Sequence, residues 1–130
     1  MKLIAFISIL LFVSNSYGQR SCLLKESEIG GKPVLIMDIT ERDQIPQLDS
    51  ICKKNGYKYP GFKWKNAIWE VVNQKDFALL KDIVEFKEDD KIFTTIFEST
   101  DARKKFYQLI CPILNDPKEF DQILGNAKKY

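Results

Sequence analysis

Hydrophobic residues recur at three- and four-residue spacing along most of this chain, the spacing that places side chains on one face of an α-helix. The pattern begins with Ile45, Leu48, Ile51 and Cys52, a segment that ends in two lysines and Gly56. Four later segments follow the same template: 64–72, 77–84, 92–97 and 102–113. The last helix is predicted within 115–126, where Asp116 and Pro117 are typical of a helix start.

Two central segments of the chain share a common pattern. Residues 67–84 and 92–110 each contain an apolar run, a polar break and a second apolar run at helical spacing. This similarity predicts two helix–turn–helix units. We therefore expect an all-α fold of about six short helices, arranged as stacked αα-hairpins or as an irregular bundle.

The composition of three segments favours strands instead. Residues 34–39, 66–72 and 91–98 contain many β-branched and aromatic side chains, which are enriched in β-strands. An α/β or α+β fold with strands near these three positions is the alternative prediction.

The N-terminus has the pattern of a secretory signal peptide. Lys2 precedes a largely apolar run of 11 residues, from Leu3 to Val13, and small residues follow at Ser16 and Gly18. A bilayer-spanning helix needs about 20 apolar residues, so this run is short for an anchor. We expect cleavage after Gly18, no stable membrane insertion afterwards, and a secreted or periplasmic protein.

Cleavage there would leave 112 residues, the size of one domain. We expect a flexible polar lead over 19–33 and a single globular domain over 34–130. Loss of Lys2 lowers the net charge from +2 to +1, and this small balance gives no reason to expect a nucleic-acid partner. An oxidising compartment permits one disulfide between two of Cys22, Cys52 and Cys111, and the sequence leaves the pairing open.

The complete lack of histidine narrows the possible chemistry. Ser-His-Asp and Cys-His nucleophile systems both need an imidazole, as do many zinc sites. The acidic run Glu88-Asp89-Asp90 lacks the alternating oxygens and the glycine of a calcium loop. We interpret it as the N-terminal cap of a helix starting near Lys91. We expect no metal, no cofactor and no catalytic residues.

The best candidate for a binding site is the segment 57–65, "YKYPGFKWK". Its Pro60-Gly61 pair predicts a type II turn with a positive φ at Gly61. Aromatic side chains around the turn could receive a partner's side chains or stack on sugar rings, although aromatic residues beside a turn also commonly close over a core. The candidate binding residues are Tyr57, Tyr59, Phe62, Lys63, Trp64 and Lys65.

These observations lead to three hypotheses for the function. The first is an exported, non-catalytic protein that recognises another macromolecule, a protein or a glycan, as inhibitors and immunity proteins do. The second is a carrier whose nine phenylalanines and other apolar residues line a cavity for a small apolar ligand. The third is a small hydrolase that uses carboxylates, which would require one buried and one solvated acid facing each other.

Overall fold

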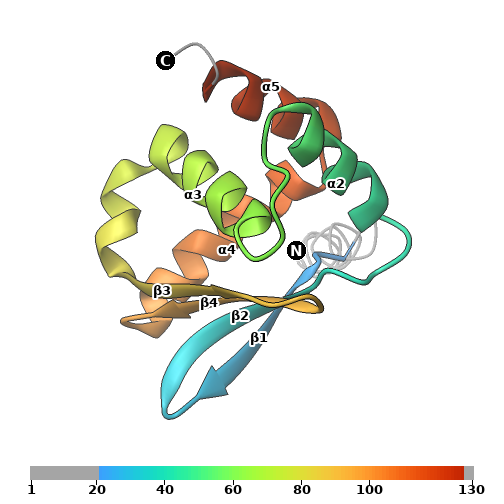
Figure 1. Ribbon diagram of the computed structural model, residues 1–130. Coiled ribbons are helices and arrows are strands. Elements are labelled where there is room, and N and C mark those ends of the chain that lie inside the picture. The colour runs from blue at the N-terminus through green and yellow to red at the C-terminus, as the bar shows by residue number, and fades with distance from the viewer. Residues whose placement is uncertain (1–20, 128–130) are drawn as a thin grey trace, which may run out of the picture.

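The computed structural model describes residues 21–127, which form an antiparallel sheet with helices packed on one of its faces (Figure 1). The strands lie in the order β1-β2-β4-β3, and every neighbouring pair is antiparallel. The elements, in chain order and with the labels of Figure 1, are β1 (Leu24–Ile29), β2 (Lys32–Asp38), α2 (Ile45–Lys54), α3 (Lys63–Lys75), the 3-10 helix η1 (Phe77–Asp82), β3 (Ile83–Glu88), β4 (Ile92–Phe97), α4 (Thr100–Leu114) and α5 (Pro117–Ala127).

The fold is mixed α+β, so the all-α prediction is wrong. The clearest failure is the segment 92–97, which forms the inner strand β4 between β2 and β3. Phe93 and Phe97 contact the core beneath the helices, whereas Ile92 and Ile96 lie on the opposite face. A strand with apolar residues on both faces gives the same spacing as a helical stripe, and only the β-branched composition distinguished the two.

The proposed pair of helix–turn–helix units is therefore not a structural repeat. Residues 67–75 belong to α3, followed by η1 and then β3, whereas residues 92–97 are a strand followed by α4. The strand alternative is right near 34–39 and 91–98, which correspond to β2 and β4. It is wrong at 66–72, which lies inside α3. Ile68, Val71 and Val72 of that helix are buried in the core, which offsets the modest helix propensity of these β-branched residues.

The expected polar lead over 19–33 contains strand β1. A two-residue turn, Gly30-Gly31, connects β1 to β2, and its φ angles of 57° and 80° suit a type I′ hairpin turn. Within β1 only Leu24 is buried, because the strand lies at the sheet edge and extends past the helices (Figure 1). An edge strand needs few apolar residues, which is why this one lacks an alternating sequence pattern. The expected cleavage site at Gly18 lies outside the described residues.

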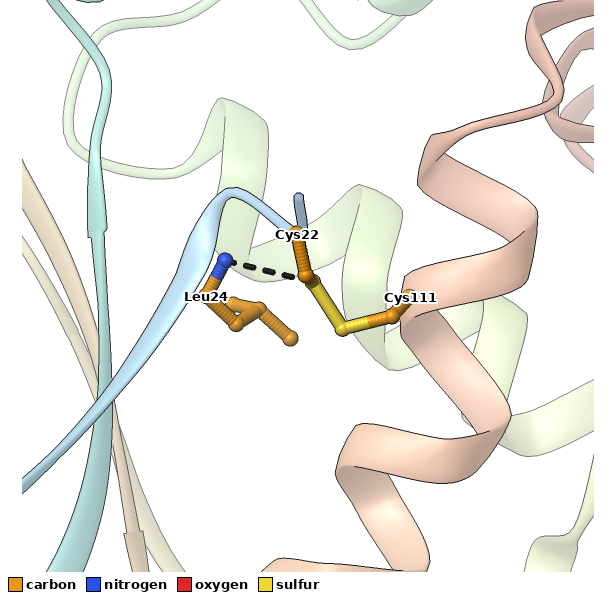
Figure 2. Close-up of a disulfide and its surroundings, with 3 residues drawn as sticks. All are labelled: Cys22, Leu24 and Cys111. Carbon is orange, nitrogen blue, oxygen red and sulfur yellow. Dashed lines mark hydrogen bonds between the residues drawn. A yellow bond between two sulfur atoms is a disulfide. The ribbon is translucent and has the colours of Figure 1, made fainter. Parts of the chain in front are cut away.

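A disulfide between Cys22 and Cys111 joins the segment just before β1 to helix α4 (Figure 2). The two Cα atoms are 5.6 Å apart and 89 positions apart in sequence. The sequence permitted one bridge among its three cysteines, and the structure contains one and selects the pair. Cys52 remains a free thiol, fully buried in α2.

The core fills the space between the sheet and helices α2 to α5. Its largest fully buried side chains include Leu35 and Phe93 from the sheet, Trp64 from α3, Phe106 from α4 and Phe120 from α5. Phe106 packs edge-to-face against Phe97 with ring centroids 5.1 Å apart. Within residues 21–127, no helix is long and apolar enough to cross a membrane.

Candidate functional site

Helix α2 ends in a turn that fixes the start of the α2–α3 connection. The Tyr57 amide donates to the Cys52 carbonyl at 2.9 Å, and the Gly56 amide donates to the Lys53 carbonyl at 3.1 Å. Gly56 has a φ of 96°, so this is the Schellman end that a C-terminal glycine permits. Tyr57 is thereby held at the margin of the core, where burial, followed by the Glu70 charge, raises the pKa of its phenol.

The Pro60-Gly61 turn redirects the chain into α3. Gly61 has a φ of 86°, and the Phe62 amide donates to the Tyr59 carbonyl at 3.1 Å, as expected of a type II turn. The Lys63 amide donates to the same carbonyl at 3.0 Å. The predicted turn is confirmed, and its hydrogen bonds fix Tyr59 and Phe62 on either side of the bend.

The first turn of α3 is anchored to the body of the protein by three side chains. Trp64 is only 1% exposed and lies in the core. The Lys63 ammonium pairs with the Asp49 carboxylate of α2. The Glu88 carboxylate of β3 accepts a hydrogen bond from the Lys65 amide at 3.0 Å, satisfying one of the free amides at the helix N-terminus. The turn before this helix therefore stands on a rigid base.

The acidic run around Glu88 does cap a helix, but not the one expected. No helix starts near Lys91, because strand β4 begins at Ile92. Glu88 caps α3 instead, and Asp89 accepts hydrogen bonds from the amides of Lys91 and Ile92, both at 2.8 Å, in the β3–β4 turn. Burial raises the pKa of Glu88 and outweighs the opposing effect of its backbone hydrogen bonds.

The charged groups beneath the turn are paired with each other. Burial alone would raise the pKa of Asp49, but hydrogen bonds from Lys63 and Lys53 outweigh it and lower that pKa. Burial, reinforced by the charge of Asp49, raises the pKa of the Cys52 thiol to about 12. The thiol is therefore protonated at neutral pH and unsuited to nucleophilic chemistry.

Three aromatic side chains near this anchored base are exposed to solvent. Tyr59 is 74% exposed, Phe62 57% and Trp69 42%. Phe62 immediately precedes α3, and Trp69 follows it by seven residues, or two helical turns, so both lie on the same side of the helix about 10 Å apart. Asn66 lies between them and is also exposed. We call Tyr59, Phe62, Asn66 and Trp69 the aromatic surface.

The six residues predicted from the sequence do not form one surface. Tyr59 and Phe62 are exposed at the turn, whereas Tyr57 and Trp64 pack into or against the core. Lys63 is tied to Asp49, and Lys65 is partly exposed on the first turn of α3. Trp69 was not among the predicted residues. Its position off the apolar stripe Trp64, Ile68, Val71 and Val72 is the signal that could have identified it.

The charge around the aromatic surface is positive. The sequence contains no acidic residue between Asp49 and Glu70, and it has five lysines in that interval. Lys53 and Lys63 pair with Asp49, and Lys54 pairs with Asp121. Neither Lys58 nor Lys65 has a carboxylate within ion-pair distance among the described residues. The charge of Lys65 acts on the nearby Glu88, which leaves Lys58 the more available of the two.

The same region offers little for metal or cofactor chemistry. No group of three or more Cys, Asp or Glu side chains among residues 21–127 is arranged to hold a metal ion. A shallow depression of about 450 Å³ beside the turn is lined by residues that include Thr40, Asp49 and Lys63. Its acid Asp49 already serves as the partner of two lysines. No protein-family model, curated protein or solved structure matches this chain.

Proposed function

We propose that the chain is an exported, non-catalytic protein that binds another macromolecule through the aromatic surface. The observation that carries this proposal is the exposure of Tyr59, Phe62 and Trp69 on a rigid, hydrogen-bonded support. Aromatic side chains, Trp and Tyr above all, dominate the energetics of protein interfaces. Large apolar side chains held rigidly in water lose little conformational entropy when a partner covers them.

Export is supported by the N-terminal apolar run and by the Cys22–Cys111 disulfide, a bond typical of oxidising compartments. The lysines near the surface favour a partner with acidic residues around an apolar centre, because complementary charge speeds association. The preferred partner is a protein, since its apolar side chains can pack against Phe62 and Trp69 while its acidic side chains pair with Lys58.

The proposal is tested by capturing partners from an extract of the source organism with the mature chain, residues 19–130, as bait. Phe62→Ser and Trp69→Ser should each lose the captured protein, with affinity for the purified partner reduced at least tenfold. The matched control is Phe77→Ser, which removes a 68% exposed phenylalanine at the start of η1, just beyond the C-terminal end of α3. Equal capture by all four baits would contradict the proposal.

Binding can also be followed by fluorescence of the two tryptophans. Trp64 is buried and Trp69 is 42% exposed, so acrylamide should quench mainly Trp69 in the free protein. A partner that covers the aromatic surface should reduce this quenching, and a Trp69→Phe variant should lose the effect while still binding. Unchanged quenching in the complex would place the partner elsewhere.

A further inference from the structure

Strand β1 provides a regular, unpaired sheet edge, at a different place from the aromatic surface. It pairs with β2 at six consecutive positions, and no other described strand pairs with it. The opposite edge of the sheet, β3, is interrupted by an irregularity between Ile83 and Glu85. Such bulges disfavour pairing with a further strand. Of the two edges, β1 is therefore the better template for an additional strand (Figure 1).

The hairpin register identifies the main-chain groups that point outward from β1. Ile29 and Lys32 close a two-residue turn and so form a hydrogen-bonded pair, and the pairs then alternate along the strands. Pro33 lies opposite Glu28, a position where its missing amide costs no bond to β1. The amides and carbonyls of Glu26 and Glu28 therefore point away from β2.

The amide of Leu24, at the start of β1, also points outward but is already hydrogen-bonded. The outward Leu24 amide donates to the Cys22 sulfur at 3.3 Å, beside the disulfide to α4 (Figure 2). The bridge thus fixes one end of the edge, and the hairpin turn fixes the other. The open segment between them has room for a short strand only.

A depression of about 550 Å³ lies alongside this open segment, between β1 and α4. The register places Glu26 opposite Leu35, on the side of the sheet that carries the helices. Alternate side chains of an added strand would enter the depression. Its lining residues are Glu26, Thr100, Asp101, Arg103, Lys104, Tyr107 and Gln108. The Arg103 guanidinium already donates to the Ser27 carbonyl of β1 at 2.8 Å.

The depression carries both signs of charge, with Arg103 held by the Ser27 carbonyl, but the residues of β1 that would lie directly opposite an added strand are Glu26 and Glu28. If the β1 edges of two copies paired antiparallel, residues whose main-chain groups point outward would lie opposite each other. Glu26 or Glu28 of one copy would then face Glu26 or Glu28 of the other. Like charges directly opposite each other are destabilising, which disfavours a second copy of this chain. A strand with lysine or arginine at those positions would instead form favourable cross-strand pairs.

We propose that the β1 edge binds an extended segment of another protein as a fifth antiparallel strand, with basic side chains opposite Glu26 and Glu28. The main-chain groups of these two residues supply the hydrogen bonds, and their carboxylates select the charge of the segment. This mode of recognition combines backbone pairing with alternate side-chain contacts.

The test uses the mature chain with its disulfide intact and a synthetic peptide, Ac-TVKVKVT-NH2, as the probe. In hydrogen-exchange measurements by NMR, the peptide should slow exchange of the Glu26 and Glu28 amides at least fivefold. The control peptide Ac-TVEVEVT-NH2 should leave both rates unchanged. Lack of protection by the basic peptide, or equal protection by the acidic one, would overturn the proposal.

A matched pair of variants separates edge pairing from general electrostatic attraction. Glu28→Pro removes an outward amide and no β1–β2 hydrogen bond, so the fold should persist and binding of the basic peptide should weaken at least tenfold. Glu28→Gln removes the charge and keeps the amide, so its loss should be smaller. Retained binding by a folded Glu28→Pro variant would contradict strand addition. If that variant does not fold, peptides N-methylated at alternate amides provide the same test with the unmodified protein.

Discussion

The Cys22–Cys111 bridge should contribute a large share of the stability of this domain. It closes a loop across a sequence separation of 89 residues, nearly the whole described chain. In the chain-entropy model, closing a loop of that length in the unfolded chain stabilises the folded state by about 4.6 kcal/mol at 25 °C. Small domains have total stabilities of about 5–15 kcal/mol, so the bridge would account for a third or more of the total.

The perturbation is the double variant Cys22→Ala/Cys111→Ala, measured against the parent by urea and thermal unfolding. The entropy of unfolding of a domain scales with its number of residues. For a domain of this size, losing about 4.6 kcal/mol of stability should lower the Tm by about 20 °C. The matched control is Cys52→Ala, which removes a buried thiol and no bridge. Its destabilisation should be only about 1 kcal/mol, the scale of one small apolar group.

The result that would refute this reasoning is a double variant that unfolds within about 1 kcal/mol of the parent. The unfolded chain would then be constrained by something other than the bridge. Peptide mapping under non-reducing conditions provides the independent check, because it should recover a Cys22–Cys111 cross-link. Ellman's reagent should find one thiol, Cys52, and only after unfolding, since its pKa is about 12 in the native state.

Three further predictions concern single side chains. The Thr95 hydroxyl is buried in β4 without a hydrogen-bond partner among the described residues, so the isosteric Thr95→Val should raise the free energy of unfolding in urea by about 1 kcal/mol. Glu88→Ala should lower it by about 1 kcal/mol through loss of the α3 cap, whereas Glu88→Gln keeps an acceptor oxygen and should change it by less than about 0.5 kcal/mol. The pKa of Asp49 is lowered below its ordinary value of 3.8, so its stabilising effect is complete above that pH and lost as pH falls through the lower folded-state value. Asp49→Asn should therefore show a shallower loss of stability in acid unfolding, and an unchanged acid profile would contradict the role of its lysine partners.

The segment 92–97 illustrates the limit of periodicity as a guide to this fold. Helical spacing and a strand buried on both faces produce the same sequence there, and the deciding factor is the presence of β2 and β3 on either side. β3 is a hairpin neighbour, but β2 comes from a position distant in the chain, so no local pattern contains that pairing. Strand β1 is a different case, because its polar residues form a strand where the Gly30-Gly31 turn folds them back onto the adjacent β2.

The candidate site was predicted in part. The Pro60-Gly61 turn follows from local chemistry, because a positive φ at the third turn position requires glycine or a similar residue. The exposure of each aromatic side chain does not follow from local chemistry. Trp64 and Trp69 both lie on α3, and only the direction from which the core packs against that helix buries the first and exposes the second.

The sequence by itself determined the local features of this protein: its Pro60-Gly61 turn, most of its helices, the lack of imidazole chemistry and a cysteine set able to form one bridge. The turn and the helices depend on interactions between residues close in the chain, and the other two features follow from composition. Tertiary structure alone decided the sheet, the disulfide pairing and the members of the aromatic surface. Each of those depends on which distant segments share a core, and burial against such segments outweighs local preference.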